Sequence, residues 1–272
     1  GKALKAFVTA HVVSAEKHPN ADKLRVCKVD AGTGTLIDVV CGAPNVPNPG
    51  EPGSSPRVVW ARPGATLPNG LVLSVREVRG VPSPGMLCAE DELGLSTDHE
   101  GIIILSNTDG LQIGSDFAAG AGLPDVIFDL DITPNRPDLL GHVGVARELC
   151  ALFASEGARL KLPATDLSAL TEPRTAVSLA AVELQDPGGC PRYLGHVITG
   201  VTVAPSPLFY RLRLSRLGVR PRSNVVDATN LALLEWGHPL HAFDLASLAE
   251  RKVVVRRARA GETLKTLDDQ QR

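Results

Sequence analysis

The sequence predicts an α+β multidomain fold, and three observations lead to this prediction. Short strand-like runs separated by turns follow one another over 1–115, a pattern typical of a small all-β domain. After residue 115 the pattern changes to apolar residues at helical spacing, mixed with short strands. The length of 272 residues suits one large or two modest domains.

The composition excludes several classes of protein. Hydrophobic residues make up 43% and charged residues 21% of the chain, which is too apolar for a disordered protein. No apolar run approaches the ~18 residues that a membrane helix needs, and no signal-peptide core follows the first residues. The five cysteines are scattered without a Cys-x-x-Cys pair, which favours free thiols in a reducing cytosol over a disulfide framework or a zinc site. The start at Gly1 rather than Met suggests a trimmed chain.

The strands expected in the first region are short and separated by turns. Five strands in about 80 residues are typical of a small closed barrel of the OB type. The loop 44–56, which holds five prolines and two glycines, interrupts them. The expected strands cover residues 6–13, 24–30, 36–40, 57–61 and 71–78.

A second region, 116–165, reads as a partial α+β domain. Residues 126–132 alternate strictly between apolar and polar, which predicts a strand. Asp138 is placed to cap a helix that runs to about residue 153, with apolar side chains on one face. A Pro- and Thr-containing linker is expected over 158–175.

The third region, 166–272, is expected to mix strands and helices. Ser206 and Pro207 open a helix that ends at Gly218, and its arginines are spread around the circumference, so that not all of them can be buried. Asn224 is expected to cap a second helix with Gly237 as its stop, and Asp244 a short third one. The expected strands cover residues 177–184, 192–203 and 252–258.

Charge is distributed unevenly along the chain, although the net charge is only −2. Residues 85–135 hold ten acidic residues and no Lys or Arg, whereas 205–222 hold five arginines and no acid. A polyanion should therefore meet the basic segments and avoid the acidic one. Ordinary solvated faces are the alternative explanation. The ten aromatic residues of the chain argue against base stacking as the main mode of binding.

Two local motifs carry candidate functional side chains. The turn at His18 precedes a basic strand, and its cations could meet a phosphate backbone or simply aid solubility; they are Lys17, Lys23, Arg25 and Lys28. The His238–His241 loop follows a helix on which Asp227 and Asn230 lie three positions apart, which suits either a polar pocket or a structural network. We expect no metal site, because a proline separates the histidines and further ligands are lacking.

Several blocks of sequence resemble a known family. Residues 18–27 and 40–46 are similar to the tRNA-binding OB domain of synthetases and their accessory proteins. The remaining blocks, in collinear order, resemble the bacterial phenylalanyl-tRNA synthetase beta subunit; they are 79–89, 92–95, 131–138, 146–148, 220–230 and 238–244.

This resemblance implies a function and partners. The family's enzyme is a cytoplasmic heterotetramer of two alpha and two beta chains, in which the alpha chain uses ATP and Mg²⁺ to charge tRNA(Phe) with phenylalanine. The beta chain binds tRNA and hydrolyses Tyr-tRNA(Phe), a reaction called editing. The family's pocket corresponds here to His241 and Asn230 as catalytic candidates and to Pro239, Asn224 and Arg222 as substrate-binding candidates. No cofactor is expected on this chain, and no membrane is involved.

The resemblance also implies an amino-terminal fragment. We expect a tRNA-binding OB domain over 1–115, a partial scaffold domain over 116–165 and the first part of the editing domain over 166–272, with the rest of the pocket beyond Arg272 and no activity in the fragment alone. Leu231 stands where the family commonly has Tyr. A stand-alone tRNA-binding module is the alternative, but it would need only 1–115. A free-standing deacylase would need a complete pocket.

Overall fold

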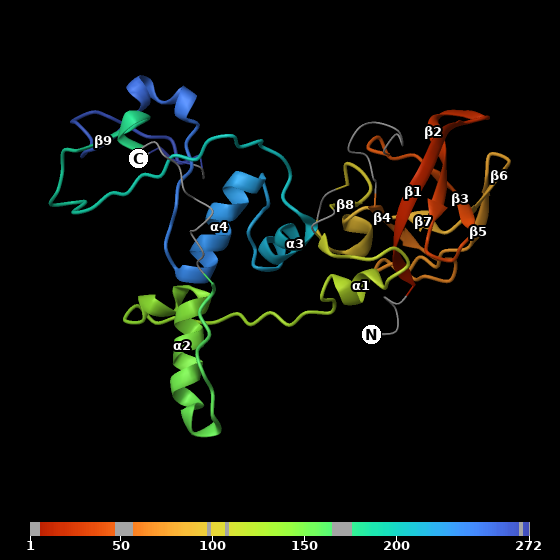
Figure 1. The fold of residues 1–272 in the computed structure, drawn as a ribbon, viewed down its shortest axis with the longest axis horizontal. Helices are drawn as coiled ribbons and strands as arrows, with labels where there is room; N and C mark the ends of the chain where they lie inside the picture. Colours follow the sequence, from red (N-terminus) through yellow and green to blue (C-terminus); the bar gives the residue numbers. More distant parts are fainter. Residues whose placement is uncertain are drawn as a thin grey trace.

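The structure is a computed structural model that describes residues 6–46, 57–96, 99–106, 109–164, 176–266 and 269–271. A β-rich part lies at one end, α2 and α4 lie in the middle, and β9 lies at the other end (Figure 1). Most of the predicted loop 44–56 falls outside the described residues. None of the helices in the described ranges is long and apolar enough to cross a membrane.

An antiparallel sheet forms the β-rich part around the long strand β1 (Phe7–His18). The strand order is β3-β2-β1-β4-β7, and β8 pairs with β4. The sequence predicted four of these strands, over 6–13, 24–30, 36–40 and 57–61, as short apolar-rich runs between turns, of which 24–30 alternates with period two. The other strands of this sheet are β2 (Ala21–Asp30), β3 (Leu36–Cys41), β4 (Arg57–Ala61), β7 (Met86–Leu87) and β8 (Ile104–Leu105).

A separate hairpin joins β5 (Val75–Val78) to β6 (Val81–Pro84). Arg79 and Gly80 both have positive φ, 49° and 90°, as a two-residue type I′ turn requires. β5 is shorter than the predicted strand 71–78. The backbone N–H of Val40 on β3 donates to the hydroxyl of Ser83 on β6 at 3.0 Å, but no strand ladder joins β3 to β7 in the described ranges. The closed barrel therefore stays a prediction.

Two groups of buried side chains make up most of the core. One lies around Val12, Val29 and Val58, and the other lies around Phe7 and Phe117. Between the sheet and the second region lie the short helices η1 (Asp91–Leu93) and α1 (Phe117–Gly120), the latter capped by Asp116, which accepts from Ala119 N. Almost all of the buried hydrophobic residues that the structure describes precede residue 122.

The predicted strand over 126–132 is wrong. These residues have no regular secondary structure, and Val126 and Phe128 are mostly exposed. A strand needs a neighbour to receive its hydrogen bonds, and alternation in the sequence does not supply one.

The predicted helix of the second region is present, but its cap differs. It divides into η3 (Pro137–Leu140), α2 (His142–Leu152) and η4 (Ala154–Glu156). Asp138 is no cap, because its carboxylate accepts from the guanidinium of Arg136 at 2.8 and 3.0 Å. Arg136 also pairs with Glu148 at 2.7 Å and lowers the pKa of both carboxyl groups.

The third region contains two longer helices, α3 (Leu208–Arg216) and α4 (Asn224–Trp236). Ser223, rather than the predicted Asn224, caps α4 by accepting from Val226 N at 3.4 Å, since Asn224 is already helical. Gly237 ends α4 in the left-handed region at φ 70°, and Asp244 caps η6, as predicted.

The two short strands of the third region, β9 (Ala181–Leu184) and β10 (Lys252–Val255), pair in parallel. The expected strand over 192–203 is wrong, since these residues have no regular structure and no partner strand. The remaining 3₁₀ turns are η5 (Ala176–Ser178), η6 (Leu245–Ser247) and η7 (Ala249–Arg251).

Candidate functional site

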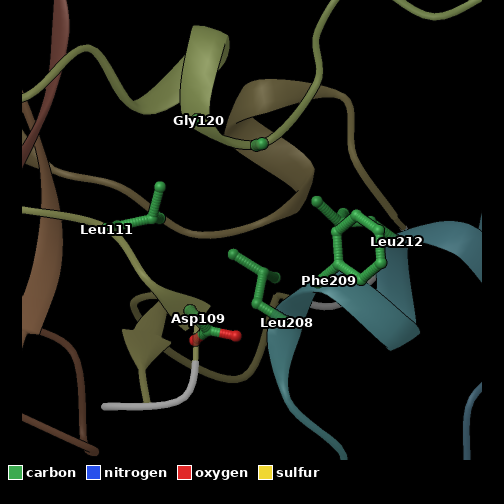
Figure 2. Close-up of a pocket in the computed structure, with 7 residues that line it drawn as sticks. Asp109, Leu111, Gly120, Leu208, Phe209 and Leu212 are labelled. Carbon is green, nitrogen blue, oxygen red and sulfur yellow. The ribbon is translucent and has the colours of Figure 1, made fainter.

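Helix α3 connects the β-rich part to α4 (Figure 1). Leu208 and Leu212 belong to the same buried group as Phe7 and Phe117. Only about 20 Å³ of space remains between Leu208, Leu212 and the loop of Leu111, so the contact is closely packed (Figure 2). The third region is thus anchored to the first by apolar side chains that are distant in sequence.

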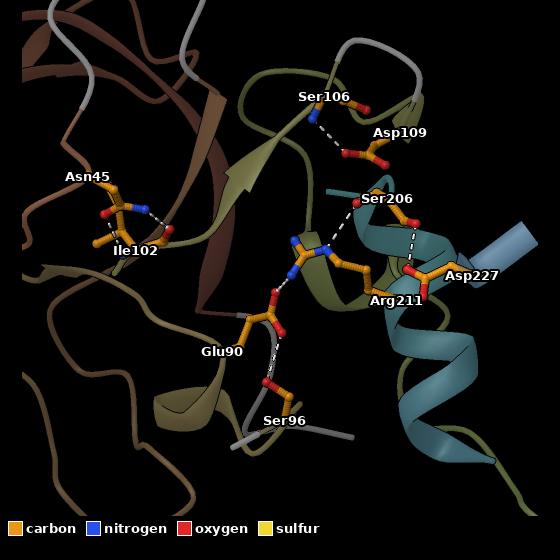
Figure 3. Close-up of polar contacts among 9 residues, drawn as sticks. All are labelled: Asn45, Glu90, Ser96, Ile102, Ser106, Asp109, Ser206, Arg211 and Asp227. Carbon is orange, nitrogen blue, oxygen red and sulfur yellow. Dashed lines mark hydrogen bonds and ion pairs between the residues drawn. The ribbon is translucent and has the colours of Figure 1, made fainter. Parts of the chain in front are cut away.

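A chain of polar contacts crosses the same junction (Figure 3). The guanidinium of Arg211 donates to the carboxylate of Glu90, whose second oxygen accepts from Ser96 Oγ at 2.8 Å. Arg211 Nε also donates to the carbonyl of Ser206 at 3.0 Å, and Ser206 Oγ donates to Asp227 Oδ2 at 2.6 Å. Since Asp227 is buried on α4, these contacts link the acidic region around η1 to the helix that carries Asn230.

The predicted residues of α4 have different surroundings. Asn224 donates its backbone N–H to Ala204 and its side-chain amide to Thr202 at 2.9 Å, so it fixes the preceding segment. Asn230 is half-buried, and its side chain has no hydrogen-bond partner in the described ranges. Arg222 donates its backbone N–H to Asp227 Oδ1 at 2.8 Å, and its side chain is exposed. Asp227 therefore has a structural role, whereas the side chains of Asn230 and Arg222 are available to a ligand.

The histidine loop follows α4 and is open to solvent. Pro239 and His241 are exposed, and the His241 ring lies 4.4 Å from the Phe243 ring, centre to centre, at an angle of 37°. Asp244 Oδ1 accepts from Ala246 N at 3.0 Å, which closes the loop. Among the described residues the imidazole of His241 has no hydrogen-bond partner, so both ring nitrogens are available to a ligand.

The four predicted tRNA-binding cations are not equivalent. Lys17 pairs with Asp22 at 2.7 Å and Lys28 with Asp38 at 2.8 Å. The hydrogen bond to Asp38 raises the pKa of Lys28.

Their positions on the sheet differ as well. Lys17 lies directly opposite Arg25 in the β1–β2 pair, and Lys23 shares a face with Arg25 by strand alternation. Lys28 points to the other face. Lys23 is exposed and has no acidic partner within the described ranges, so it is the cation of this group that is most available to a phosphate.

The His18 turn has a structural role. His18 is buried, its Nδ1 accepts from Asn20 N at 3.1 Å, and its Nε2–H donates to the Val78 carbonyl at 3.0 Å. The Asn20 amide donates to Arg79 O at 2.9 Å. These bonds fasten the β1–β2 turn to the β5–β6 turn. No group of three or more His, Cys, Asp or Glu side chains in the described ranges is arranged to hold a metal ion.

Sequence reasoning did not identify the pairing of Arg211 with Glu90 or the groove between α3 and α4. The groove has a volume of about 420 Å³ and lies between Tyr210 on α3 and Leu231 and Trp236 on α4. The helical spacing of Ala228, Leu231 and Ala232 on α4 is the signal that could have indicated it.

Comparisons with known proteins match the chain over its whole length. The family described as "Putative tRNA binding domain" matches residues 7–116, and the family "B3/4 domain" matches 189–272. The phenylalanine–tRNA ligase beta subunit of Nitratidesulfovibrio vulgaris is 44% identical over 99% of this chain, and that of Anaeromyxobacter dehalogenans is 45% identical over 100%.

The chain spans about a third of the length of these relatives, 32% in both cases. Among solved structures, the C-terminal domain of Plasmodium vivax p43 aligns with a TM-score of 0.29 at 25% identity, over 40% of this chain and 56% of that one, which is too low to support an argument about the fold. The two family matches and the similarity along this chain agree: the chain contains a tRNA-binding and a B3/4 domain match, and from end to end it is similar to phenylalanine–tRNA ligase beta subunits.

Proposed function

We propose that the chain acts within a phenylalanine–tRNA ligase, where it binds tRNA(Phe) and contributes to the hydrolysis of tRNA(Phe) wrongly charged with tyrosine. The observation that supports this most strongly is the order of a tRNA-binding domain and a B3/4 domain in one chain that resembles beta subunits from end to end. The anchoring of α3 in the β-rich part gives the two domains a fixed relationship, which suits a protein that must hold tRNA while its acylated end is inspected.

The chemistry of tyrosine and phenylalanine explains the need for a second pocket. A pocket built for the phenylalanine side chain rejects an analogue with one added hydroxyl by only about 10²-fold. A second pocket that hydrogen-bonds the phenol selects the error, because phenylalanine would leave its polar groups unpaired. Within the described ranges, the side chains of His241 and Asn230 carry polar atoms without a hydrogen-bond partner in the chain.

We assign these side chains different parts in hydrolysis. His241 holds the phenol or the attacking water, Asn230 donates to the oxyanion that forms when water attacks the ester carbonyl, and Pro239 shapes the loop between them. Arg222, which is exposed, is placed for a tRNA phosphate. Asn224 supports the site through its bonds to Thr202 and Ala204.

We further propose the context in which the chain works. Its partners are tRNA(Phe) and an alpha subunit, in a cytoplasmic heterotetramer of two alpha and two beta chains, and ATP and Mg²⁺ serve the charging site of the alpha subunit. The β-rich part is an OB-type barrel over 1–115, followed by a scaffold over 116–165 and an editing segment over 166–272. The sheet order around β1 and the family matches support this division.

The test is hydrolysis of Tyr-tRNA(Phe), measured for this chain and for the intact ligase. His241→Ala in the intact ligase should leave phenylalanine charging unchanged and slow the hydrolysis by about 10²-fold or more. His238→Ala, an exposed neighbour in the same loop, is the matched control and should hydrolyse normally. Normal hydrolysis in the His241 variant would remove this residue from the site. Binding of tRNA without hydrolysis in the intact ligase would favour a binding module instead.

A further inference from the structure

The groove between α3 and α4 has an aromatic lining that is open to solvent. Tyr210 and Trp236 are 45% and 42% exposed and line it from the two helices. Asn224, Leu231 and Glu235 also line it and share one face of α4. Asn230 lies about 140° around the helix from Glu235, so it is on another side of α4 from this lining, whereas Asn224, which supports the proposed hydrolytic site, lines the groove itself.

The arginines of α3 and of the segment that follows it fall into two groups. Arg211 and Arg216 are anchored, since Arg211 pairs with Glu90 and Arg216 with Asp125 at 3.0 Å. Three others between 213 and 222 are exposed and have no acidic partner among the described residues; they are Arg213, Arg220 and Arg222. Two of these five arginines thus hold α3 against the rest of the chain, and the other three face solvent.

One of these unpaired charges, Arg213, lies beside aromatic side chains on α3, and the other two lie on the segment that enters α4. Arg213 follows Phe209 by four positions and Tyr210 by three, so all three are neighbours on the exposed arc of α3. Arg220 and Arg222 lie on the segment that leads into α4, which begins beside the groove at Asn224. Glu235 is the one acid in the lining, and its carboxylate would repel a phosphate while accepting from the amino group of a base.

Exposed aromatic faces beside free guanidinium groups suit single-stranded nucleic acid. Unpaired bases stack on aromatic rings while the cations hold the backbone, and a duplex keeps its bases out of reach of such a groove. A purely apolar helix of a protein partner would leave Glu235 and the arginines without partners.

We propose that the groove binds single-stranded RNA, with a base against Tyr210 and Trp236 and the phosphates on Arg213, Arg220 and Arg222. This inference rests on the proposed function, because it takes tRNA as the natural ligand. It adds an RNA-binding surface remote from the β1–β2 surface; the groove does not use His241 or Asn230, but it shares Asn224 and Arg222 with the proposed hydrolytic site.

The two tryptophans of the chain make the proposal directly measurable. Trp60 is buried and donates its Nε1–H to Pro84 O at 3.0 Å, whereas Trp236 is exposed. Titration of this chain with a short unstructured RNA should quench the fluorescence of Trp236, and the same sequence as a duplex should quench little. Trp236→Phe removes the signal and serves to assign it, and Trp236→Ala should weaken binding about tenfold or more.

The arginines are tested by the salt dependence of binding. Replacing Arg213, Arg220 and Arg222 together by Gln should lower the slope of log K against log salt by about 0.7 for each phosphate that the variant no longer neutralises. Arg256→Gln is the matched control, because Arg256 pairs with Glu262 at 2.7 Å and lies outside the groove. Its slope should equal that of the unmodified chain.

The outcomes separate this proposal from the proposed function. Binding of tRNA without any response of Trp236 to single-stranded RNA would overturn the groove proposal and leave the proposed function standing. Failure to bind any RNA would overturn both. Two other outcomes would also overturn the groove proposal, because the occupant would then not be single-stranded RNA. One is equal quenching by duplex RNA, and the other is quenching by an apolar peptide but not by RNA.

Discussion

Arg211 on α3 forms an ion pair with Glu90, which lies 121 positions earlier in the sequence. The two side chains are only 19% and 8% exposed, so the pair is largely removed from water. Glu90 also accepts from Ser96, and Arg211 also donates to the Ser206 carbonyl. The pair therefore joins the β-rich part to the third region at the place where Leu208 and Leu212 enter the core.

We predict that Arg211→Met lowers the free energy of unfolding by about 3 kcal/mol, because it leaves the Glu90 carboxylate buried without its cation. Urea unfolding measures this change. Arg213→Met, on the same helix but exposed, should change stability by less than about 0.5 kcal/mol. Adding Glu90→Gln to Arg211→Met should restore part of the stability, and a fully additive double variant would show that the two residues are not coupled.

Lys23 should contribute more to tRNA binding than Lys17 or Lys28, since the latter two already pair with acids. Lys23→Gln should lower the slope of log K against log salt by about one, because one phosphate is no longer neutralised. Lys28→Gln is the matched control and should lower the slope less. Equal slopes for the Lys23 variant and the unmodified chain would make Lys23 an ordinary surface charge.

The cysteines should divide into two reactivity classes. Burial raises the pKa of the Cys27 thiol to about 12 and also raises the pKa values of Cys41 and Cys88, so thiolate is scarce at neutral pH. Cys150 and Cys190 are half-exposed and should react first with iodoacetamide, as mass spectrometry of the native chain would show. All five should react in denaturant. Rapid alkylation of Cys27 in the native chain would contradict this assignment.

The Arg256–Glu262 pair should make the loop after β10 sensitive to acid. A side-chain hydrogen bond from Arg256, with a backbone one from Arg259, lowers the pKa of Glu262 from its ordinary 4.5 to about 2. The charged form is thus favoured in the folded loop, so its stabilising effect is complete above about pH 4.5 and disappears as the pH falls towards 2. An NMR titration of the Glu262 carboxyl measures this directly. Arg256→Gln should return the midpoint towards 4.5, and an unchanged midpoint would assign the shift to another group.

Local patterns in the sequence predicted much of the secondary structure. Strand β2 follows from period-two alternation, and β1, β3 and β4 follow from short apolar-rich runs between turns. The ends of α4 follow from Gly237 and from the polar residues at the start of the helix. The two wrong strands, 126–132 and 192–203, show the limit of such patterns. Alternation shows that a segment could have two different faces, but it does not say whether another strand lies beside it. The β6 strand was not predicted because two of its four residues are prolines.

The candidate site was accessible to sequence reasoning only in part. The spread of arginines around α3 indicated that some would stay exposed, and the structure places Arg213 in solvent while Arg211 is largely buried. No local sequence pattern indicated that Glu90 pairs with Arg211, because this pairing depends on how two segments distant in sequence pack together. His241 and Asn230 rest on a family resemblance, and their roles in hydrolysis stay predictions.

Helix α3 packs against the β-rich part on one side and α4 on the other, so its length cannot change without disturbing one of these contacts. Leu212 and Leu214 are both nearly or fully buried, yet they point about 160° apart around the helix, so both sides are occupied. Inserting one residue between them would turn the remainder of the helix by about 100° and advance it by about 1.5 Å. Arg216 would then leave Asp125, and α4 would be offset from the β-rich part. Insertions and deletions should therefore be tolerated in the loops on either side of α3 but not within it. The helix sets both the distance and the rotation between the segments that it joins.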